Sequence, residues 1–403
     1  MEQNLNLNEN SKTGILLSFL FCFYLFYCFF EPYINNVVGA GGKYLIFLVI
    51  ICFVLSYHKI RFEWYHLSVI LWLLLKSASI FWASFNYIVQ LHFFSQIGMV
   101  ALFITMSLVS FNDKFIKSVI NTALYSSFLI GILSLFYSRP FLSETFNDRQ
   151  VLTLFGVQND PNDQAAFLLV GIAIALNVVL NGKALSKIFN VMMVAICLVN
   201  AYAILLTGSR GGLMSLMILI LAAILLSGRS EKSIPKKLAK NFVFLGLFGL
   251  SLYIIANNYL PADSFKRMFD FTSYLGGSGR MDIWENVLPI FLNSPVFGGG
   301  WGSYWGYNGY YTAVHNTFLS VLTDSGIVGF LLLFMPVFVI GSKAMKKGYA
   351  LPFLIFIAGF APSLFLDAIN KRFFWNALIV SLILITNQIN KDRKVDNEEK
   401  IKN

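Results

Sequence analysis

Long apolar runs separated by short polar segments follow one another along most of the chain. Twelve of them approach the length of about 20 residues that an α-helix needs to cross the hydrocarbon core of a bilayer. The second and the eighth are short. The approximate bounds of the runs are 14–30, 43–57, 65–83, 90–110, 116–137, 164–181, 187–206, 211–228, 241–258, 316–340, 350–366 and 373–389. This pattern predicts an all-α polytopic membrane protein with about 12 transmembrane helices.

The composition agrees with that pattern. Charged residues make up 12% of the chain, about half the share that is usual in soluble domains, and the mean hydropathy is +0.69. The four cysteines lie inside apolar runs without paired spacing, so neither a disulfide framework nor a zinc site is expected. A soluble fold with a large core is therefore excluded.

The basic residues indicate the orientation in the membrane. If the N-terminus is cytoplasmic, 20 of the 30 Lys and Arg residues lie in segments on the cytoplasmic side, as the positive-inside rule requires. An even number of spans then places both termini in the cytoplasm. The net charge of +10 is accounted for by this bias, and no nucleic-acid partner is expected.

Two outer segments are long, 138–163 and 258–314, and we expect the chemistry to lie on that face. The chain divides into a membrane domain with spans one to nine (1–257) and an extracytoplasmic, periplasmic loop between spans nine and ten (258–314). The last three spans (315–390) and a cytoplasmic tail (391–403) follow.

Two glycine-flanked arginines belong to this outer face. Arg210 lies in TGSRGG, where glycines let the chain turn and keep space open beside the guanidinium. Arg280 lies in GGSGRMDIW, a glycine-rich turn that runs into a helix start and could bind an anion. Both could hold a phosphate bidentately. The alternatives are an interfacial Arg210 that reaches lipid headgroups, and an Arg280 that caps its helix or pairs with Asp282 or Glu285.

His315 stands beside the large outer loop, in HNTFLSVLTDSG. A neutral imidazole is suited to proton abstraction near neutral pH, although an interfacial histidine bonded to the backbone is the plainer interpretation. Asp324 follows about two and a half helical turns later and should face away from His315, capping a helix break at Ser325–Gly326 or lining a cavity. Lys76 lies within the third span and is either functional or snorkelling.

Further polar and aromatic positions are candidates for glycan contacts. Asp160 and Asp163 lie in the DPND sequence before the sixth span, which lacks the spacing of a calcium loop. Trp301 and Tyr304 lie in FGGGWGSYWGYNGYY, where aromatic rings could stack on sugars or anchor at the membrane interface. No metal site and no cofactor is predicted.

The order of these motifs resembles the O-antigen ligase and polysaccharide polymerase family. The chain offers GVQNDPNDQAAFLL, TGSRGG, GRMDIW, FGGGWGSY and HNTFLSVLTDSGIVG in the family's sequence. The resemblance implies a helix arrangement like that of GT-C glycosyltransferases and a metal-independent reaction. It also implies that Arg210 and Arg280 bind the diphosphate of an undecaprenyl-diphosphate-linked glycan, with His315 beside the acceptor hydroxyl or the leaving group.

The function expected from this resemblance is polymerisation of lipid-linked oligosaccharide repeat units into O-antigen or capsule, on the outer face of the bacterial cytoplasmic membrane. The donor, the acceptor and membrane lipid are the expected partners, and a chain-length regulator protein is a further one. An O-antigen ligase that transfers the glycan to lipid A core or protein is the first alternative. A polysaccharide transporter or flippase is the second, although the two halves of the chain show no visible repeat.

Overall fold

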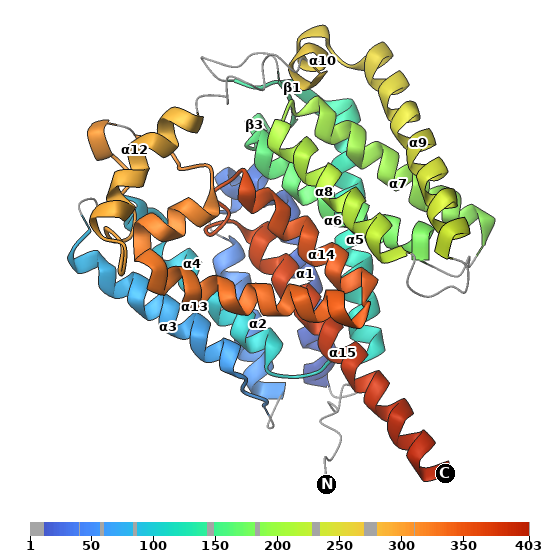
Figure 1. Cartoon of the computed structure of the whole chain (residues 1–403), viewed down its shortest axis with the longest axis horizontal. Helices are drawn as coiled ribbons and strands as arrows, with labels where there is room; N and C mark the ends of the chain where they lie inside the picture. Colours follow the sequence, from blue (N-terminus) through green and yellow to red (C-terminus); the bar gives the residue numbers. More distant parts are fainter. Residues whose placement is uncertain are drawn as a thin grey trace.

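The chain forms an all-α bundle in its computed structural model, as predicted (Figure 1). The structure describes residues 12–39, 41–56, 60–83, 87–142, 149–181, 186–227, 234–269, 280–309 and 311–402. The helices are α1 (Lys12–Val38), α2 (Gly41–Ser56), α3 (Trp64–Ala78), α4 (Tyr87–Ser107), α5 (Asp113–Tyr137), α6 (Pro161–Asn181), α7 (Lys187–Leu206), α8 (Arg210–Ser227), α9 (Ile234–Tyr259), α10 (Ala262–Phe269), α12 (Arg280–Asn293), α13 (Thr317–Lys347), α14 (Ala350–Phe360) and α15 (Arg372–Lys402). Short 3₁₀ helices cover Ser79–Phe81, Tyr307–Gly309 and Ala361–Leu364.

Within the described ranges, ten helices are long and apolar enough to cross a membrane. Two shorter apolar segments, Gly41–Ser56 and Ala350–Leu364, account for the other two predicted runs. The second run is short, as predicted. The eighth is not, because α8 has 18 residues. The eleventh is the second short one, because α14 ends at Phe360 and a 3₁₀ turn continues the apolar sequence.

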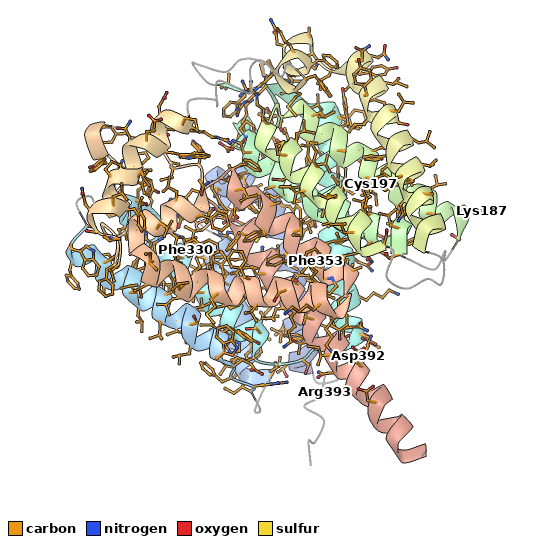
Figure 2. All side chains as sticks on the ribbon, in the orientation of Figure 1. Lys187, Cys197, Phe330, Phe353, Asp392 and Arg393 are labelled. Atoms are coloured by element: carbon orange, nitrogen blue, oxygen red, sulfur yellow. The ribbon has the colours of Figure 1, made fainter. Side chains whose placement is uncertain are left out.

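Helix α6 lies at the centre of the bundle. It packs against α5, α7, α8 and α14, and 78% of its most apolar stretch is buried, compared with 11% for the peripheral α9. Small residues permit this close packing: a Cβ at Gly171 would lie 2.6 Å from Asn200 Nδ2 on α7. Side chains fill the space between the helices, with Cys197 among them, whereas Asp392 and Arg393 lie toward the projecting end of α15 (Figure 2).

One end of the bundle carries the irregular structure. The helices α10 and α12 lie there with the strands β1 (Ser138–Pro140), β2 (Gln150–Leu154) and β3 (Val157–Gln158), opposite the two chain termini (Figure 1). The strands form an antiparallel sheet in the order β1-β2-β3. The hydropathy pattern did not predict this sheet. Its central strand is held to α6 by a hydrogen bond from Leu152 N to Gln164 Oε1 (3.0 Å).

Helix α13 is broken at Gly326, where a break was predicted. This residue has φ 63° and ψ −164°, which a glycine adopts without steric cost. The amides freed by the break are satisfied by the chain that follows α12: Ile327 N donates to Pro295 O (2.9 Å), and Val328 N donates to Val296 O (3.1 Å). Non-helical backbone is tolerated in a membrane-spanning helix where protein supplies such partners.

A buried ion pair lies beside the break. Lys76 Nζ is 3.1 Å from Asp324 Oδ2, and the two side chains are 1% and 2% exposed. Asp324 Oδ1 also accepts a hydrogen bond from Gly302 N (2.9 Å), and the ammonium lies 4.8 Å from the centre of the Trp301 ring. The snorkelling interpretation of Lys76 is therefore wrong. Asp324 instead ties the helix break to α3 and to the loop that precedes His315.

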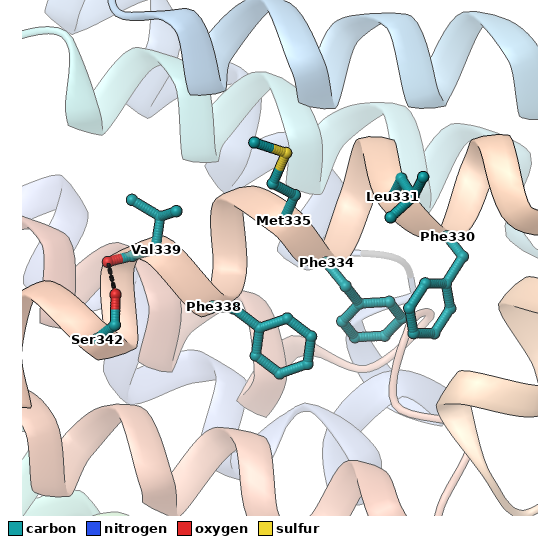
Figure 3. A pocket seen from close by; sticks show the side chains of 7 residues that line it. All are labelled: Phe330, Leu331, Phe334, Met335, Phe338, Val339 and Ser342. Atoms are coloured by element: carbon teal, nitrogen blue, oxygen red, sulfur yellow. Dashed lines mark hydrogen bonds between the residues drawn. The ribbon is translucent and has the colours of Figure 1, made fainter.

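The second half of α13 borders an open apolar groove of about 370 Å³ (Figure 3). Phe330, Phe334 and Phe338 project from one side of the helix, and Met335 and Val339 project from another. The ring of Phe334 also stacks on Phe318 at 4.7 Å, so aromatic side chains connect this groove with the helix start beside His315.

Candidate functional site

Ser209 organises the start of α8 and joins two of the predicted motifs. Its Oγ accepts a hydrogen bond from Gly212 N (3.0 Å), which is the capping interaction that a helix N-terminus requires. The same Oγ donates to Asn162 Oδ1 in the DPND sequence (2.7 Å). The TGSRGG turn and the start of α6 therefore form one hydrogen-bonded unit, from which Arg210 extends.

The glycines after Arg210 permit close packing at the start of α8. A Cβ at Gly211 would lie 2.7 Å from Phe365 Cβ, and one at Gly212 would lie 2.6 Å from Ala165 Cβ on α6. Only hydrogen fits at either position. This close approach brings the start of α8 directly against α6 and against the chain that leads into α15.

The two DPND aspartates have different environments. Asp160 caps α6, since its Oδ1 accepts hydrogen bonds from Asn162 N (2.8 Å) and Asp163 N (3.3 Å), and the residue is otherwise exposed. The buried Asp163 forms an ion pair with Lys371 Nζ at 2.6 Å. Asp160 is therefore exposed at the end of the bundle that carries the strands, and its glycan contact stays a prediction.

Arg280 is the first residue of α12, and the preceding turn 276–279 lies outside the described residues. Trp284 lies one turn further on the same face, where its Nε1 donates to Val314 O (2.9 Å). This bond fixes the residue before His315 to the helix that begins with Arg280. In the described part of the chain, Arg280 forms no ion pair with Asp282 or Glu285, which was one of the two alternatives considered for it.

His315 occupies a constrained turn at the start of α13. Its φ of 53° lies in the left-handed region, which a residue with a side chain adopts at a cost, and such strain is often found at functional sites. Asn316 then caps the helix by accepting from Leu319 N (3.0 Å). Thr317 Oγ1 donates to Leu366 O (2.6 Å) and accepts from Ala368 N (2.8 Å). The backbone on both sides of His315 is thereby fixed.

The charges around His315 favour its neutral form. Burial lowers the pKa of the imidazole and the Arg280 guanidinium lowers it further, while Asp160 and Asp367 oppose this shift. Burial also lowers the pKa of Arg280, as do the charges of Arg210 and Arg267, while Asp160 opposes this shift; an arginine remains protonated in any accessible pH range. The site therefore combines a neutral base with several fixed positive charges.

Two more arginines belong to this cluster, and the sequence analysis did not select them. Arg267 on α10 donates from Nε to Gly208 O (3.1 Å), and Arg210 Nε donates to Arg267 O (3.4 Å). A Cβ at Gly208 would lie 3.1 Å from Arg149 Cγ, so Arg149 flanks the same turn. Neither arginine has a distinctive sequence context. Their position became evident only from the contacts of α10 and β2 with the start of α8.

The two aromatic candidates lie inside the protein. Trp301 is 0% exposed and donates from its backbone N to Ser79 Oγ (2.8 Å). Tyr304 is 3% exposed, and its hydroxyl donates to Asp367 Oδ2 (3.2 Å). Both rings contribute to packing beneath the site, and neither presents a face on which a sugar could stack.

The comparisons with known proteins bear on the same region. Residues 194–334 match the family model described as O-antigen ligase. This region is similar to the O-antigen ligase family. The match begins inside α7 and ends inside α13, so it contains Arg210, Arg280 and His315 in one continuous stretch. This similarity supports a membrane glycosyltransferase-like function in surface polysaccharide synthesis.

The other comparisons add little. No curated protein matches the chain. One solved structure, a chain from a peptidoglycan synthase complex described as coordinating polymerization and crosslinking, is similar over 81% of this chain and 98% of its own length. Its sequence identity is 14% and the TM-score is 0.48, a likeness that bears on neither activity nor substrate.

Proposed function

We propose that this protein is a membrane glycosyltransferase that uses a glycan linked to a polyprenyl diphosphate, specifically undecaprenyl diphosphate. The observation that carries the proposal is the cluster of Arg210, Arg267 and Arg280, whose last member acts on a half-buried His315 and lowers its pKa. Guanidinium groups recognise phosphate oxygens with charge and geometry, and a neutral imidazole can accept a proton. The apolar groove on α13 offers a surface for the polyprenyl chain.

The proposed reaction is a direct displacement. The acceptor hydroxyl oxygen forms a bond to the anomeric carbon as the bond from that carbon to the diphosphate oxygen breaks, with inversion. The hydroxyl proton moves to His315, and the diphosphate leaves with the bonding electrons. Arg210 and Arg280 neutralise the charge that develops on the leaving group, a stabilisation stronger in the transition state than in the ground state. We propose that this role makes the reaction metal-independent.

Among the acceptors, we favour a second lipid-linked repeat unit, which makes the protein a polymerase of O-antigen or capsule. The motif that supports this choice is DPND, whose Asn162 is joined to Ser209 beside Arg210. In this proposal the site faces outward from the cytoplasmic membrane of a bacterium, and both termini are cytoplasmic. A chain-length regulator is a proposed protein partner.

The decisive experiment supplies purified protein in detergent with lipid-linked repeat units and, separately, with lipid A core as an acceptor. A ladder of products from repeat units alone supports a polymerase. Transfer only to the core lipid supports a ligase, and no transfer with either acceptor leaves a transporter as the better explanation.

The His315→Ala variant tests the proposed base. Because a positioned base contributes about 10²–10⁴-fold, turnover should fall by at least the lower of these factors while the protein elutes from gel filtration as the wild type does. The product ladder measures turnover. Normal ladder formation by this variant would remove His315 from the mechanism.

A further inference from the structure

A two-residue turn joins β2 to β3 and leaves an aromatic side chain in the open. Leu154 pairs with Val157, so Phe155 and Gly156 form the turn. Both have positive φ, 53° and 76°, as a type I′ hairpin turn requires, and such turns favour Asn or Asp followed by Gly. Phe155 is 78% exposed although it lies on no membrane-spanning helix. A bulky apolar residue therefore occupies a position where the turn itself favours a small polar one.

The backbone of Phe155 is strained in the same way as that of His315. Among the described residues, these two alone combine a side chain with a left-handed φ. For a bulky residue this conformation has a steric cost, and such costs are often found at functional sites. A Cβ at Gly156 would meet no atom within 4 Å, so the space beside the turn is open to a ligand.

The hairpin below the turn is fixed to the neighbouring chain. The Gln158 side chain donates from Nε2 to Pro140 O (2.9 Å) on β1 and to Thr153 Oγ1 (3.1 Å) on β2. Its Oε1 accepts from Leu142 N (2.9 Å), just after β1. One side chain of β3 therefore joins all three strands, and Phe155 projects from a fixed base.

The hairpin begins and ends beside the arginine cluster of the candidate site. Arg149, which flanks the turn at Gly208, directly precedes β2. After β3 the chain reaches Asn162, which accepts the hydrogen bond from Ser209. The strands lie at the same end of the bundle as α10 (Figure 1). The six residue steps from Arg149 to Phe155 span about 20 Å at the rise of an antiparallel strand, a distance that an oligosaccharide bridges and a single sugar does not.

Charged groups on both sides of the turn favour a sugar over a lipid chain as its occupant. Arg149 precedes β2, and the exposed Asp160 follows β3. A carboxylate accepts hydrogen bonds from sugar hydroxyls, whereas an acyl chain beside it would remove water from the charge at a cost.

We propose that Phe155 is a glycan-binding residue, whose ring stacks on a sugar of the lipid-linked oligosaccharide several units away from the diphosphate. This inference rests on the proposed function of the site. The aliphatic face of a sugar ring packs on an aromatic face while its hydroxyls stay in water. Trp301 and Tyr304 are buried and offer no such face. The contact adds binding and no chemistry, so it favours a full repeat unit over a single sugar.

The first test reports on Phe155 without relying on transfer. Because the chain contains 41 phenylalanines, para-fluorophenylalanine is placed at position 155 alone by amber suppression. The probe is the lipid-free oligosaccharide released by mild acid from the surface polysaccharide of cells that make the protein. Its addition in detergent should shift the fluorine NMR signal saturably, and the constituent monosaccharides should not. Absence of a shift with the oligosaccharide, together with a shift on reconstitution into phosphatidylglycerol nanodiscs, would identify a membrane anchor and overturn the proposal.

Variants of the same residue separate binding from folding. Phe155→Asn gives the turn the sequence that type I′ geometry favours, so unfolding by SDS titration should show a stability at least equal to that of the wild type. The KM for lipid-linked repeat units should rise about 10-fold with kcat unchanged, because the contact is the same in the ground state and the transition state. Phe155→Trp keeps an aromatic face and should retain the wild-type KM. Phe155→Leu keeps an apolar side chain without a ring and should raise KM as Phe155→Asn does.

Leu142→Ala is the matched control. Leu142 is 84% exposed and bonds to Gln158, so it is an apolar neighbour of the hairpin that lies outside the turn. Its truncation should leave KM unchanged, and a rise equal to that of Phe155→Asn would overturn the specific role of the ring. Transfer with an unchanged KM in Phe155→Asn would also overturn that role and leave the proposed function intact. An oligosaccharide-dependent fluorine shift without any transfer in the wild type would instead support the glycan contact and contradict the proposed function.

Discussion

The ion pair between Lys76 and Asp324 makes a strong prediction about stability. In Lys76→Met, a side chain of similar length replaces the ammonium, and the Asp324 carboxylate keeps its buried position at 2% exposure without a counter-charge. Breaking a buried pair from one side typically costs about 3–5 kcal/mol, because the remaining charge is left uncompensated. The free energy of unfolding should therefore fall by an amount in this range.

The matched variant is Asp324→Asn, which removes the charge but keeps an oxygen for the hydrogen bond from Gly302 N. In the double variant no charge remains at the break, so the two losses should not add. We expect a coupling energy of about 2 kcal/mol between the positions, within the range for residues in direct contact. Unfolding by SDS titration in mixed micelles, followed by tryptophan fluorescence, measures all four free energies.

Two results would refute this reasoning. Strict additivity of the two single variants would mean that the charges do not interact. A loss below about 1 kcal/mol in Lys76→Met would mean that the carboxylate is solvated or protonated at little cost. The transfer assay on the double variant adds a functional readout: activity near the wild-type level is expected, since the pair supports the loop structurally and does not contact the reacting atoms.

Three further predictions concern the site itself. Arg280→Lys should lower turnover by about 10²-fold because a lysine cannot donate bidentately, whereas Arg139→Lys, an exposed arginine on β1, should have no effect in the same ladder assay. Ser209→Ala should cost about 1 kcal/mol in the SDS titration, since it removes the cap of α8 and the donor to Asn162; an unchanged stability would contradict the capping role. The acidic limb of kcat/KM against pH should lie below the ordinary histidine pKa of about 6.5, because burial and Arg280 lower the pKa of His315 and the active base is the neutral form; a limb above that value would refute the electrostatic account.

The spans were largely predictable because membrane-spanning helices must be apolar over a known length. The span bounds were wrong where the apolar sequence continues although the backbone leaves the α-helical conformation. Residues 361–364 lie within the predicted apolar run 350–366, so the length of that run does not reveal that the helix tightens into a 3₁₀ turn there. The strands β1, β2 and β3 are only 3, 5 and 2 residues long, too short for an alternating pattern to be recognised.

The site was predictable only where the local sequence around a residue is distinctive. Arg210, Arg280 and His315 lie in sequence contexts with unusual glycine, polar or helix-start residues, so their motifs could be recognised. Arg267 and Arg149 carry no such context. Their place in the cluster depends on contacts of Arg267 and Arg149 with the turn at Gly208, which are tertiary contacts that no local pattern contains.

The break in α13 has a consequence for protein engineering. The amides of Ile327 and Val328 complete their hydrogen bonding with the carbonyls of Pro295 and Val296. These bonds connect the loop that follows α12 to the broken helix α13. A chimera that exchanges the loop between α12 and α13 with that of a relative would disrupt these hydrogen bonds if the junction fell at the start of α13. Junctions placed before α12 and after residue 328 would transfer the loop, His315 and the broken helix as one exchangeable module.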